Sequence, residues 1–254
     1  MEISLKDKVA LITGASGGIG KATAIKLAQC GAKLALGGRN LEKLLQVQNE
    51  CLKYTQEVET FQVDLEIAHE IYDFVFKVIS KFSTINIVVS IAGTLENRGK
   101  KFWEIDAVKW RKTFEVNLFA NVDLIQSALP YLKKEPYSKI ILISSNIGLR
   151  PAGFSSDYCA SKAALINFGQ SLAVELAPFK ILTNVICPGP VRTDMLKLSH
   201  EVEETIKNYI PLKKIGEPED VAHLITFLAS DYANWLTGSI FVIDGGALLA
   251  YAKN

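Results

Sequence analysis

The alternation of short apolar runs with longer amphipathic stretches constrains the fold of this sequence more than any other feature. Seven short runs have the length and composition of β-strands, at residues 8–13, 32–38, 57–64, 85–90, 139–145, 181–189 and 239–244. Six stretches with helical periodicity lie between them, at residues 18–30, 40–53, 66–82, 103–134, 157–178 and 217–230. Continuously apolar strands are typical of a parallel sheet that helices cover on both faces. The sequence therefore predicts an α/β fold with a doubly wound sheet of seven parallel strands.

Length and charge limit the domain organisation and the classes of partner. The 254 residues contain no repeat, low-complexity tract or linker-like segment, which favours one domain over residues 1–254. Lys plus Arg is 28 and Asp plus Glu is 27, and no basic cluster exceeds two consecutive lysines, as at Lys133–Lys134 and Lys213–Lys214. This balance predicts neither nucleic acid nor an anionic membrane as a partner.

The cysteines and histidines give no sign of a metal site or of a disulfide framework. Four cysteines and three histidines are scattered along the chain without a Cys-x-x-Cys pair. The first residues lack the long apolar segment of a secretory signal, and no apolar run approaches the length of a membrane span. We therefore expect a cytoplasmic protein without a bound metal.

A glycine-rich turn follows the first apolar run directly. Residues 13–20 read TGASGGIG, and a helical pattern begins at residue 18. Glycines at 14, 18 and 20 would let the backbone approach a pyrophosphate, and the helix N-terminus would offer free N–H groups to the anion. A flexible turn is the plain alternative. The position in the first strand–helix unit favours dinucleotide binding by a Rossmann-type fold.

Tyr158 and Lys162 stand four positions apart in a predicted helix and so share one of its faces. Both side chains titrate near pH 10 in model compounds, so neither alone would transfer protons well near neutral pH. Such a pair is common in any helix, and its meaning depends on the rest of the chain.

The ordered motifs of the chain resemble those of the short-chain dehydrogenase/reductase family. After the glycine-rich turn, which has the spacing G-x-x-x-G-x-G, the resemblance extends over nearly the whole sequence. The matching segments are VSIAG (89–93), VNL (116–118), ISSNIG (143–148), YCASK (158–162), PGPVRTDM (188–195), PLKKIGEPEDVA (211–222) and GSIFVIDGG (238–246). Each segment alone is a modest signal, whereas their order and spacing together are specific.

The resemblance implies four catalytic residues, Asn117, Ser145, Tyr158 and Lys162. Tyr158 would be the general acid in carbonyl reduction and the base in alcohol oxidation. Lys162 would lower the pKa of the Tyr158 phenol and hold the nicotinamide ribose. Ser145 would donate a hydrogen bond to the substrate oxygen, and Asn117 would position a water molecule beside the lysine. Each residue also has a non-catalytic interpretation. Ser145 could be a hydroxyl at a strand end, Asn117 a helix-kink residue and Tyr158 a core aromatic.

The resemblance also implies a cofactor site built from several segments. Where the family commonly has Asn-Asn-Ala-Gly, this chain has Ser90 followed by Ile91, Ala92 and Gly93, and we expect the serine to keep a hydrogen bond that braces the strand. Asp64 and Leu65 would meet the adenine, although Asp64 could instead cap a helix. The complete predicted set is Gly14, Ser16, Gly18, Ile19, Gly20, Arg39, Asp64, Leu65, Ile91, Ala92, Gly93, Tyr158, Lys162, Pro188, Gly189, Val191 and Thr193.

The residues after the second strand predict a preference for NADP(H), with NAD(H) as the alternative. NAD-binding versions of this fold place an acidic residue at the end of that strand. Here the position is Gly38, and Arg39 follows, whose guanidinium suits a 2′-phosphate. Gly17 stands where many NADP-dependent relatives carry a second basic residue, which weighs against this preference.

The predicted function is hydride transfer between NADP(H) and a ketone or secondary alcohol. Among family members the chain looks most similar to 3-oxoacyl-acyl-carrier-protein reductases, which makes a 3-oxoacyl thioester one candidate substrate. A sugar or polyol dehydrogenase is the alternative, and a non-catalytic nucleotide-sensing regulator is disfavoured by the intact catalytic set. We expect a lid at 194–211 and a substrate pocket built from loop residues, namely Leu95, Asn97, Ile147, Leu149, Phe154 and Met195. Family resemblance and the apolar chain end (247–254) predict a homotetramer.

Overall fold

The computed structural model describes residues 2–196 and 199–250 and contains one parallel sheet of seven strands. The order across the sheet is β3-β2-β1-β4-β5-β6-β7, so the strand order reverses between β1 and β4. The doubly wound sheet predicted from the sequence is therefore confirmed. The strands are β1 (Val9–Thr13), β2 (Lys33–Gly38), β3 (Val58–Gln62), β4 (Ile87–Ser90), β5 (Ser138–Ile143), β6 (Ile181–Pro188) and β7 (Ile240–Ile243).

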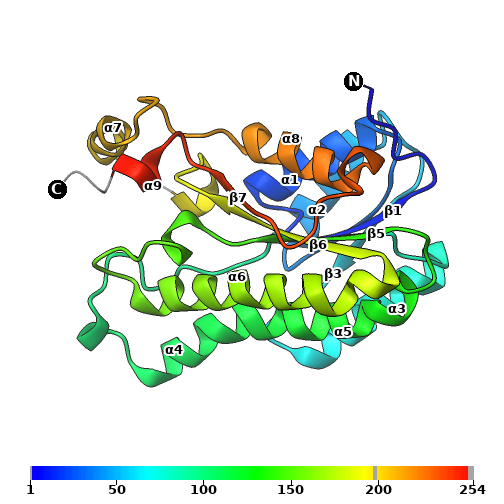
Figure 1. The fold of residues 1–254 in the computed structure, drawn as a ribbon, viewed down its shortest axis with the longest axis horizontal. Helices are drawn as coiled ribbons and strands as arrows, with labels where there is room; N and C mark the ends of the chain where they lie inside the picture. Colours follow the sequence, from blue (N-terminus) through cyan, green and yellow to red (C-terminus); the bar gives the residue numbers. More distant parts are fainter. Residues whose placement is uncertain (1, 197–198, 251–254) are drawn as a thin grey trace.

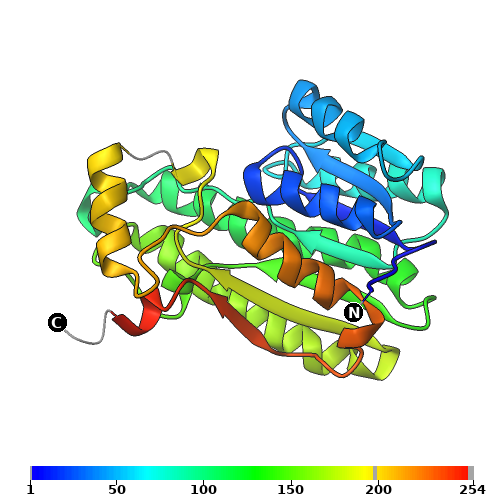
Figure 2. The ribbon, with the colours of Figure 1, turned by 90° about the horizontal axis from the view of Figure 1, so that it is seen from above.

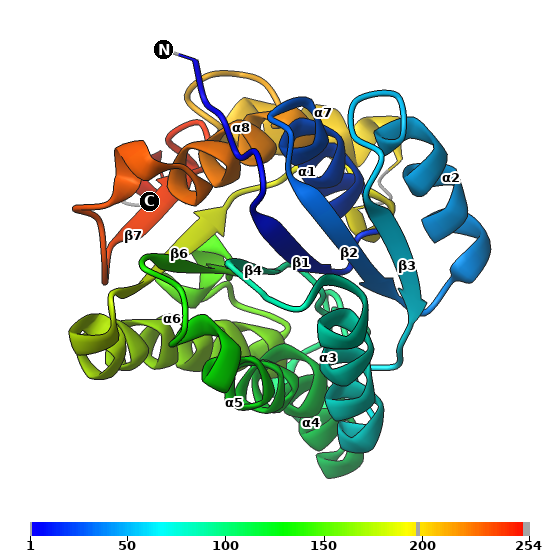
Figure 3. The ribbon, with the colours of Figure 1, turned by 90° about the vertical axis from the view of Figure 1, so that its right-hand side faces the viewer.

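Helices cover both faces of the sheet, as Figures 1 and 3 show. One face packs α1 (Gly18–Gln29), α2 (Leu41–Cys51) and α8 (Pro218–Ala229), whose buried side chains join one core cluster with β1 and β2. The other face packs α3 (Ala68–Phe82), α5 (Ala120–Leu132) and α6 (Ser156–Leu176), with α4 (Ala107–Phe114) beside α6. β1, β4, β5 and β6 are buried along their whole length, because they lie between these two helix layers.

The single helix predicted over 103–134 is wrong, because the chain divides there into several pieces. A short 3-10 turn, Phe102–Glu104, precedes α4, and the Asp106 carboxylate accepts a hydrogen bond from the Lys109 N–H at the start of α4. A π-helical turn, Glu115–Phe119, then separates α4 from α5. Such a turn inserts an extra residue into the helical ladder, and the insertion falls at Asn117.

Two further elements lie near the carboxyl ends of the strands, outside the two helix layers. The 3-10 turn Asp194–Leu196 and α7 (His200–Tyr209) stand at one end of the molecule, near α9 (Ala247–Ala250), as Figure 2 shows from above. Residues 197–198, part of the predicted lid, lie outside the described residues. Other 3-10 turns are Asn146–Gly148, Ala177–Phe179 and Asp231–Ala233. Within the described ranges no helix combines the length and apolar character needed to cross a bilayer.

Candidate active site

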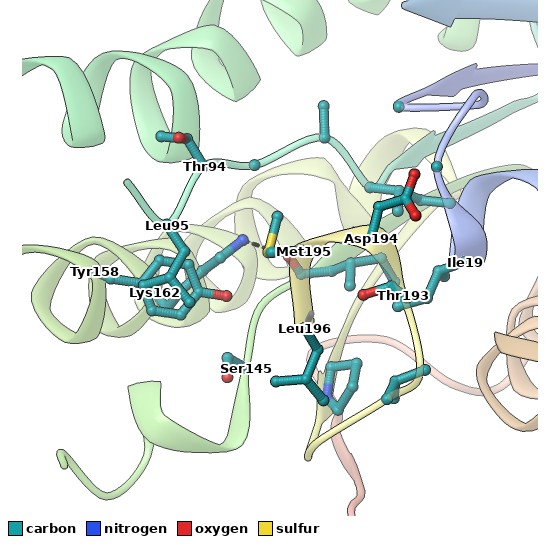
Figure 4. A pocket seen from close by; sticks show the side chains of 18 of the residues that line it. Ile19, Thr94, Leu95, Ser145, Tyr158, Lys162, Thr193, Asp194, Met195 and Leu196 are labelled. Atoms are coloured by element: carbon teal, nitrogen blue, oxygen red, sulfur yellow. Dashed lines mark hydrogen bonds between the residues drawn. The ribbon is translucent and has the colours of Figure 1, made fainter. Parts of the chain in front are cut away.

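A cavity of about 980 Å³ opens at the carboxyl ends of the strands, beside the point where the strand order reverses. Ligands of open α/β sheets bind at this position. All of the predicted cofactor residues line the cavity, and so do Ser145, Tyr158 and Lys162. Figure 4 shows these three residues on one side and the segment from Thr193 to Leu196 facing them. The structure thus brings together residues from nearly the whole length of the chain.

The glycine-rich turn is shaped by contacts that leave no room for side chains. Gly14 has φ +68°, and a Cβ there would lie 2.8 Å from the Ala92 nitrogen. A Cβ on Gly20 would lie 2.1 Å from the Gly14 carbonyl oxygen. No side chain caps the N-terminus of α1 at Gly17, so its first N–H groups face the cavity mouth uncapped. A narrow backbone cradle with an uncapped helix end fits a pyrophosphate.

Ser90 stands in place of the family's asparagine and still braces the strand end. Its hydroxyl lies 3.2 Å from the Thr13 hydroxyl across the β1–β4 pair. The Thr13 hydroxyl oxygen also accepts hydrogen bonds from the backbone N–H groups of Ile91 and Ala92. This connection holds the start of the Ile91–Gly93 segment against the glycine-rich turn. No sequence pattern indicates this role of Thr13, because the role depends on the pairing of two strands.

The end of β2 carries no side chain where it meets the glycine-rich turn. A Cβ on Gly38 would meet the Ser16 hydroxyl at 3.3 Å, so a larger side chain here would crowd the glycine-rich turn. The Arg39 side chain is 70% exposed, and its nearest ionic partner is Glu66, with the atoms 3.7 Å apart. Lys43, which sequence reasoning missed, lines the same part of the cavity one helical turn further along. The region therefore carries two cations on an open surface.

Asp64 and Leu65 follow β3 and line the cavity. The Asp64 carboxylate accepts a hydrogen bond from the Glu66 N–H, and the Asp64 N–H donates to the Glu70 carboxylate. α3 begins at Ala68, and its N-cap position is Ile67, without a capping side chain. The alternative that Asp64 is the N-cap of this helix is therefore wrong, because Asp64 lies three residues before the N-cap and its carboxylate stabilises the turn at 64–66.

Tyr158 and Lys162 lie on the first two turns of α6 and are both buried. The Lys162 ammonium donates to the Ile143 carbonyl oxygen at 2.9 Å, at the end of β5. The Ser144 hydroxyl donates to the Lys162 carbonyl oxygen at 2.8 Å, which ties the same strand end to the helix backbone. Ser145 follows as the next residue, and its hydroxyl favours the phenolate form of Tyr158. The strand end thus fixes Lys162 and places Ser145 on the same cavity as Tyr158.

Burial is the largest influence on the pKa values of Tyr158 and Lys162. It raises the pKa of the Tyr158 phenol to about 12, with the Ser145 hydroxyl as the largest opposing influence. It lowers the pKa of the Lys162 ammonium to about 8. The expected lowering of the tyrosine pKa by the adjacent lysine is therefore not seen in this structure, because the loss of hydration outweighs the other influences on the phenol.

Asn117 lies in the π-helical turn, is fully buried and does not line the cavity. Its side-chain oxygen accepts from the Thr94 N–H at 2.8 Å, and its amide group donates to the Thr94 carbonyl and to the Ser161 hydroxyl. A Cβ on Gly93 would lie 3.1 Å from this side-chain oxygen and 3.3 Å from the Lys162 ammonium. Asn117 therefore supports the loop after β4 directly behind Lys162.

Four of the six predicted substrate-pocket residues line the cavity, namely Leu95, Ile147, Phe154 and Met195. The prediction is wrong for Asn97 and Leu149. Asn97 is 2% exposed because its amide donates to the buried Asp157 carboxylate, away from the cavity. Leu149 points outward and is exposed. The neighbours Arg98 and Arg150, which sequence reasoning missed, line the cavity in their place.

Metal ligation finds no support in the part of the chain that the structure describes. Those residues contain no group of three or more His, Cys, Asp or Glu side chains close enough together to hold an ion. The residues around the cavity match a dinucleotide instead.

A doubly wound sheet with a glycine-rich first turn and a Ser, Tyr and Lys set on the same cavity defines a dinucleotide-dependent oxidoreductase. A family model described as "Enoyl-(Acyl carrier protein) reductase" matches residues 14–247. The chain belongs to the short-chain dehydrogenase/reductase family. It is an NAD(P)-dependent oxidoreductase that interconverts ketones and alcohols.

Relatives and solved structures match over nearly the full chain. The 3-oxoacyl-[acyl-carrier-protein] reductase FabG of Aquifex aeolicus is 35% identical, covering 97% of this chain and 99% of the relative. A dehydrogenase/reductase from Sinorhizobium meliloti is similar in structure, with a TM-score of 0.92, 33% identity and 97% of both chains covered. L-sorbose reductase from Gluconobacter frateurii, solved with NADPH and L-sorbose, has a TM-score of 0.89 and 28% identity, covering 98% of this chain and 99% of that one.

The depressed pKa of Lys162 predicts that this residue destabilises the fold. The unfolded chain binds this proton up to about pH 10.5 and the folded chain only up to about pH 8, so stability rises with pH between these values. The shift corresponds to about 3 kcal/mol below pH 8. We expect Lys162→Met to increase the free energy of unfolding at pH 7 by about 1–3 kcal/mol, since it also removes the hydrogen bond to Ile143.

Urea unfolding of both proteins at pH 7 and pH 9.5 measures this effect. The advantage of Lys162→Met should shrink at the higher pH, whereas Lys77→Met on the exposed face of α3 should show no such change. If Lys162→Met is less stable than the wild type at pH 7, the prediction is wrong, because the contacts of the Lys162 ammonium then outweigh its loss of hydration.

Proposed function

We propose that this chain reduces a ketone, or oxidises the matching secondary alcohol, with NADP(H), and that Ser145, Tyr158 and Lys162 carry the chemistry. The observation that supports this most is their position on the wall of the cavity that begins at the glycine-rich turn. A cofactor held by that turn and a substrate beside Tyr158 would share one enclosed space.

In this proposal Tyr158 transfers the proton and Ser145 orients the substrate. The Tyr158 hydroxyl donates its proton to the carbonyl oxygen during reduction and recovers it during oxidation. Ser145 donates a second hydrogen bond to the same oxygen and stabilises its developing negative charge. Lys162, held by the Ile143 carbonyl, supplies positive charge beside the phenolate. We propose that Asn117 supports a bound water molecule behind Lys162 for return of the proton.

The cofactor, when bound, supplies the hydride acceptor or donor. The backbone of Gly14–Gly20 and the α1 N-terminus would hold its pyrophosphate, and Lys162 its ribose. Asp64 and Leu65 would contact the adenine, and Pro188, Gly189, Val191 and Thr193 would enclose the nicotinamide. We propose that residues 194–211 act as a lid, since Met195, Leu196, Val202 and Ile206 line the cavity.

Replacing the Tyr158 hydroxyl tests the proton-transfer role. Tyr158→Phe keeps the ring and removes the acid, and positioned acid–base groups contribute about 10²- to 10⁴-fold. We expect kcat to fall by about that factor while cofactor binding, followed by fluorescence titration, is unchanged. Tyr54→Phe, at an exposed tyrosine after α2, serves as the control. Turnover within a few fold of the wild type would exclude Tyr158 as the proton donor.

We propose a preference for NADP(H) because Gly38 has no side chain and Arg39 offers an exposed guanidinium. The solved L-sorbose reductase holds NADPH. Glu66 weighs in the other direction, since its carboxylate lies 3.7 Å from Arg39 and also pairs with Lys112. An ion pair this exposed contributes about 0–1 kcal/mol, so a 2′-phosphate can replace it readily.

The Arg39→Ala variant tests the cofactor preference. Hydrogen bonds to charged groups contribute about 1.5–3 kcal/mol. We therefore expect the Kd for NADPH to rise about ten- to a hundredfold and the Kd for NADH to stay nearly unchanged. Lys77→Ala, which removes a charge from an exposed site on α3, is the control. A wild-type enzyme whose kcat/KM favours NADH would contradict the proposal.

Two substrate classes are candidates for the proposed enzyme, and a protein without catalytic activity is the third hypothesis. A 3-oxoacyl thioester is favoured by the similarity to the Aquifex aeolicus reductase, and a sugar or polyol by the similarity to L-sorbose reductase. A non-catalytic nucleotide sensor is disfavoured by the convergence of Ser145, Tyr158 and Lys162 on the cavity. Turnover with a panel of ketones and alcohols separates these three readings.

We propose that the chain assembles as a homotetramer in the cytoplasm. Large apolar side chains are exposed in several elements. Trp103, Val108 and Phe119 lie in or beside α4, Val174 lies on α6, and Trp235, before β7, is 98% exposed. Residues 251–254, part of the chain end expected to pack in the assembly, lie outside the described residues. Four free cysteines match a reducing compartment.

Light scattering coupled to gel filtration measures the assembly. With a chain mass of 27.9 kDa, a tetramer should appear at four times that value at micromolar concentration. Trp235→Glu places a charge at one of these exposed apolar positions and should reduce the tetramer to dimers. A monomeric wild type would contradict the proposal.

A further inference from the structure

Arg98 occupies the wall of the cavity at the end that holds Tyr158. It lies in the loop after β4, is half-buried, and lines the cavity together with Tyr158, Leu95 and Phe154. Its guanidinium donates a hydrogen bond through Nη2 to the Met195 carbonyl oxygen. Its positive charge also acts on the phenol, where it opposes the increase of the Tyr158 pKa by burial. Arg98 is thus a cation within electrostatic reach of the predicted proton donor.

The loop that carries Arg98 is fixed on both sides by the start of α6. Asn97 donates through its amide to the Asp157 carboxylate at 2.8 Å, and the Ser155 hydroxyl donates to the Asn97 carbonyl oxygen. The Gly99 N–H donates to the same Ser155 hydroxyl at 3.0 Å. Both neighbours of Arg98 are therefore held by residues just ahead of Tyr158. This support sets the position of the guanidinium relative to the phenol.

The Arg98 charge has no carboxylate partner in the part of the chain that the structure describes. Within residues 2–196 and 199–250, Arg98 forms no ion pair, and its one hydrogen bond is to a neutral carbonyl oxygen. The acidic lining residues lie elsewhere: Asp64 and Glu66 follow β3, and Asp194 pairs with Lys43 on α2 and lies beside Ile19 and Thr193 in Figure 4.

We propose that Arg98 binds a carboxylate of the substrate, so that the substrate is an oxo acid or hydroxy acid with its anionic group close to the reacting carbon. A guanidinium presents a planar fork of donors that matches a carboxylate, and a carboxylate accepts more strongly than the Met195 carbonyl. This inference rests on the proposed ketone reduction and narrows its substrate class. An acyl thioester carries no charge beside its ketone and would leave Arg98 without an anionic partner.

Matched pairs of acid and ester test the proposal. The probes are 3-oxobutanoate with its methyl ester and 3-oxocyclohexanecarboxylate with its methyl ester, each assayed with NADPH and NADH. We expect the wild type to prefer both acids. In Arg98→Gln, the ratio of kcat/KM for the acids to kcat/KM for the esters should fall about ten- to a hundredfold, as expected for loss of a hydrogen bond between charged groups. Loss of the charge near the Tyr158 phenol lowers both values by the same factor and so leaves this ratio unaffected.

Two further variants separate a specific contact from general charge or loss of structure. Lys100→Gln removes one positive charge from the same loop at a residue that does not line the cavity, and it should leave the ratio of acid to ester unchanged. Arg98→Lys keeps the charge without the planar fork and should retain part of the preference. An equal fall for acid and ester in Arg98→Gln, or a wild type that prefers the esters, would overturn the proposal.

A binding measurement keeps this inference separate from the proposed function. Calorimetric titration of the cofactor-loaded protein with butanoate and with butanamide requires no turnover. Tighter binding of butanoate that disappears in Arg98→Gln supports the carboxylate site even if none of the ketones is reduced. Equal binding of the two probes by the wild type rejects the carboxylate site, and reduction of the esters would then leave the proposed ketone reduction intact.

Discussion

The site depends on close packing at three glycines. Because these residues have no side chain, neighbouring backbone and side-chain atoms can approach them closely. Gly14 lies against Ala92, Gly93 lies against Asn117 and Lys162, and a Cβ on Gly148 would lie 2.8 Å from the Lys162 carbonyl carbon. These contacts bring the ends of β1, β4 and β5 and the first turns of α6 to one point. A side chain at any of the three positions would separate elements that must share the cavity wall.

The same convergence buries the groups that must exchange protons. Tyr158 and Lys162 lose hydration together, which raises the pKa of the phenol and lowers that of the ammonium. Both shifts oppose the charged forms that catalysis requires. The influences that favour a phenolate are local, and they come from the Ser145 hydroxyl and the charge of Arg98. Polar contacts around Tyr158 therefore do more for its acidity in this structure than the lysine beside it.

Much of the fold and of the site follows from local sequence patterns, and the remainder depends on packing between distant segments. Apolar runs located all seven strands to within about two residues at most ends, because buried parallel strands have a strong local signature. The division of 103–134 was missed, since a π-helical turn has no such signature. Asn97 was assigned to the pocket and Arg98 was overlooked, because only the contact of Asn97 with Asp157 decides which neighbour faces the cavity.

The segment 192–196, whose residues from Thr193 onward face Tyr158, is held more firmly at its start than at its end. At its base, the Arg192 N–H donates to the Gly216 carbonyl oxygen, and the Arg192 guanidinium pairs with both Glu203 and Glu217. At its tip, Asp194 pairs with Lys43 across the cavity mouth, with both side chains more than half exposed, and the Arg98 guanidinium donates to the Met195 carbonyl oxygen. Backbone pairing with a charge network resists separation better than contacts made by single exposed side chains do. Opening of the cavity should therefore occur by movement of the tip, around residue 194, while the base stays in place.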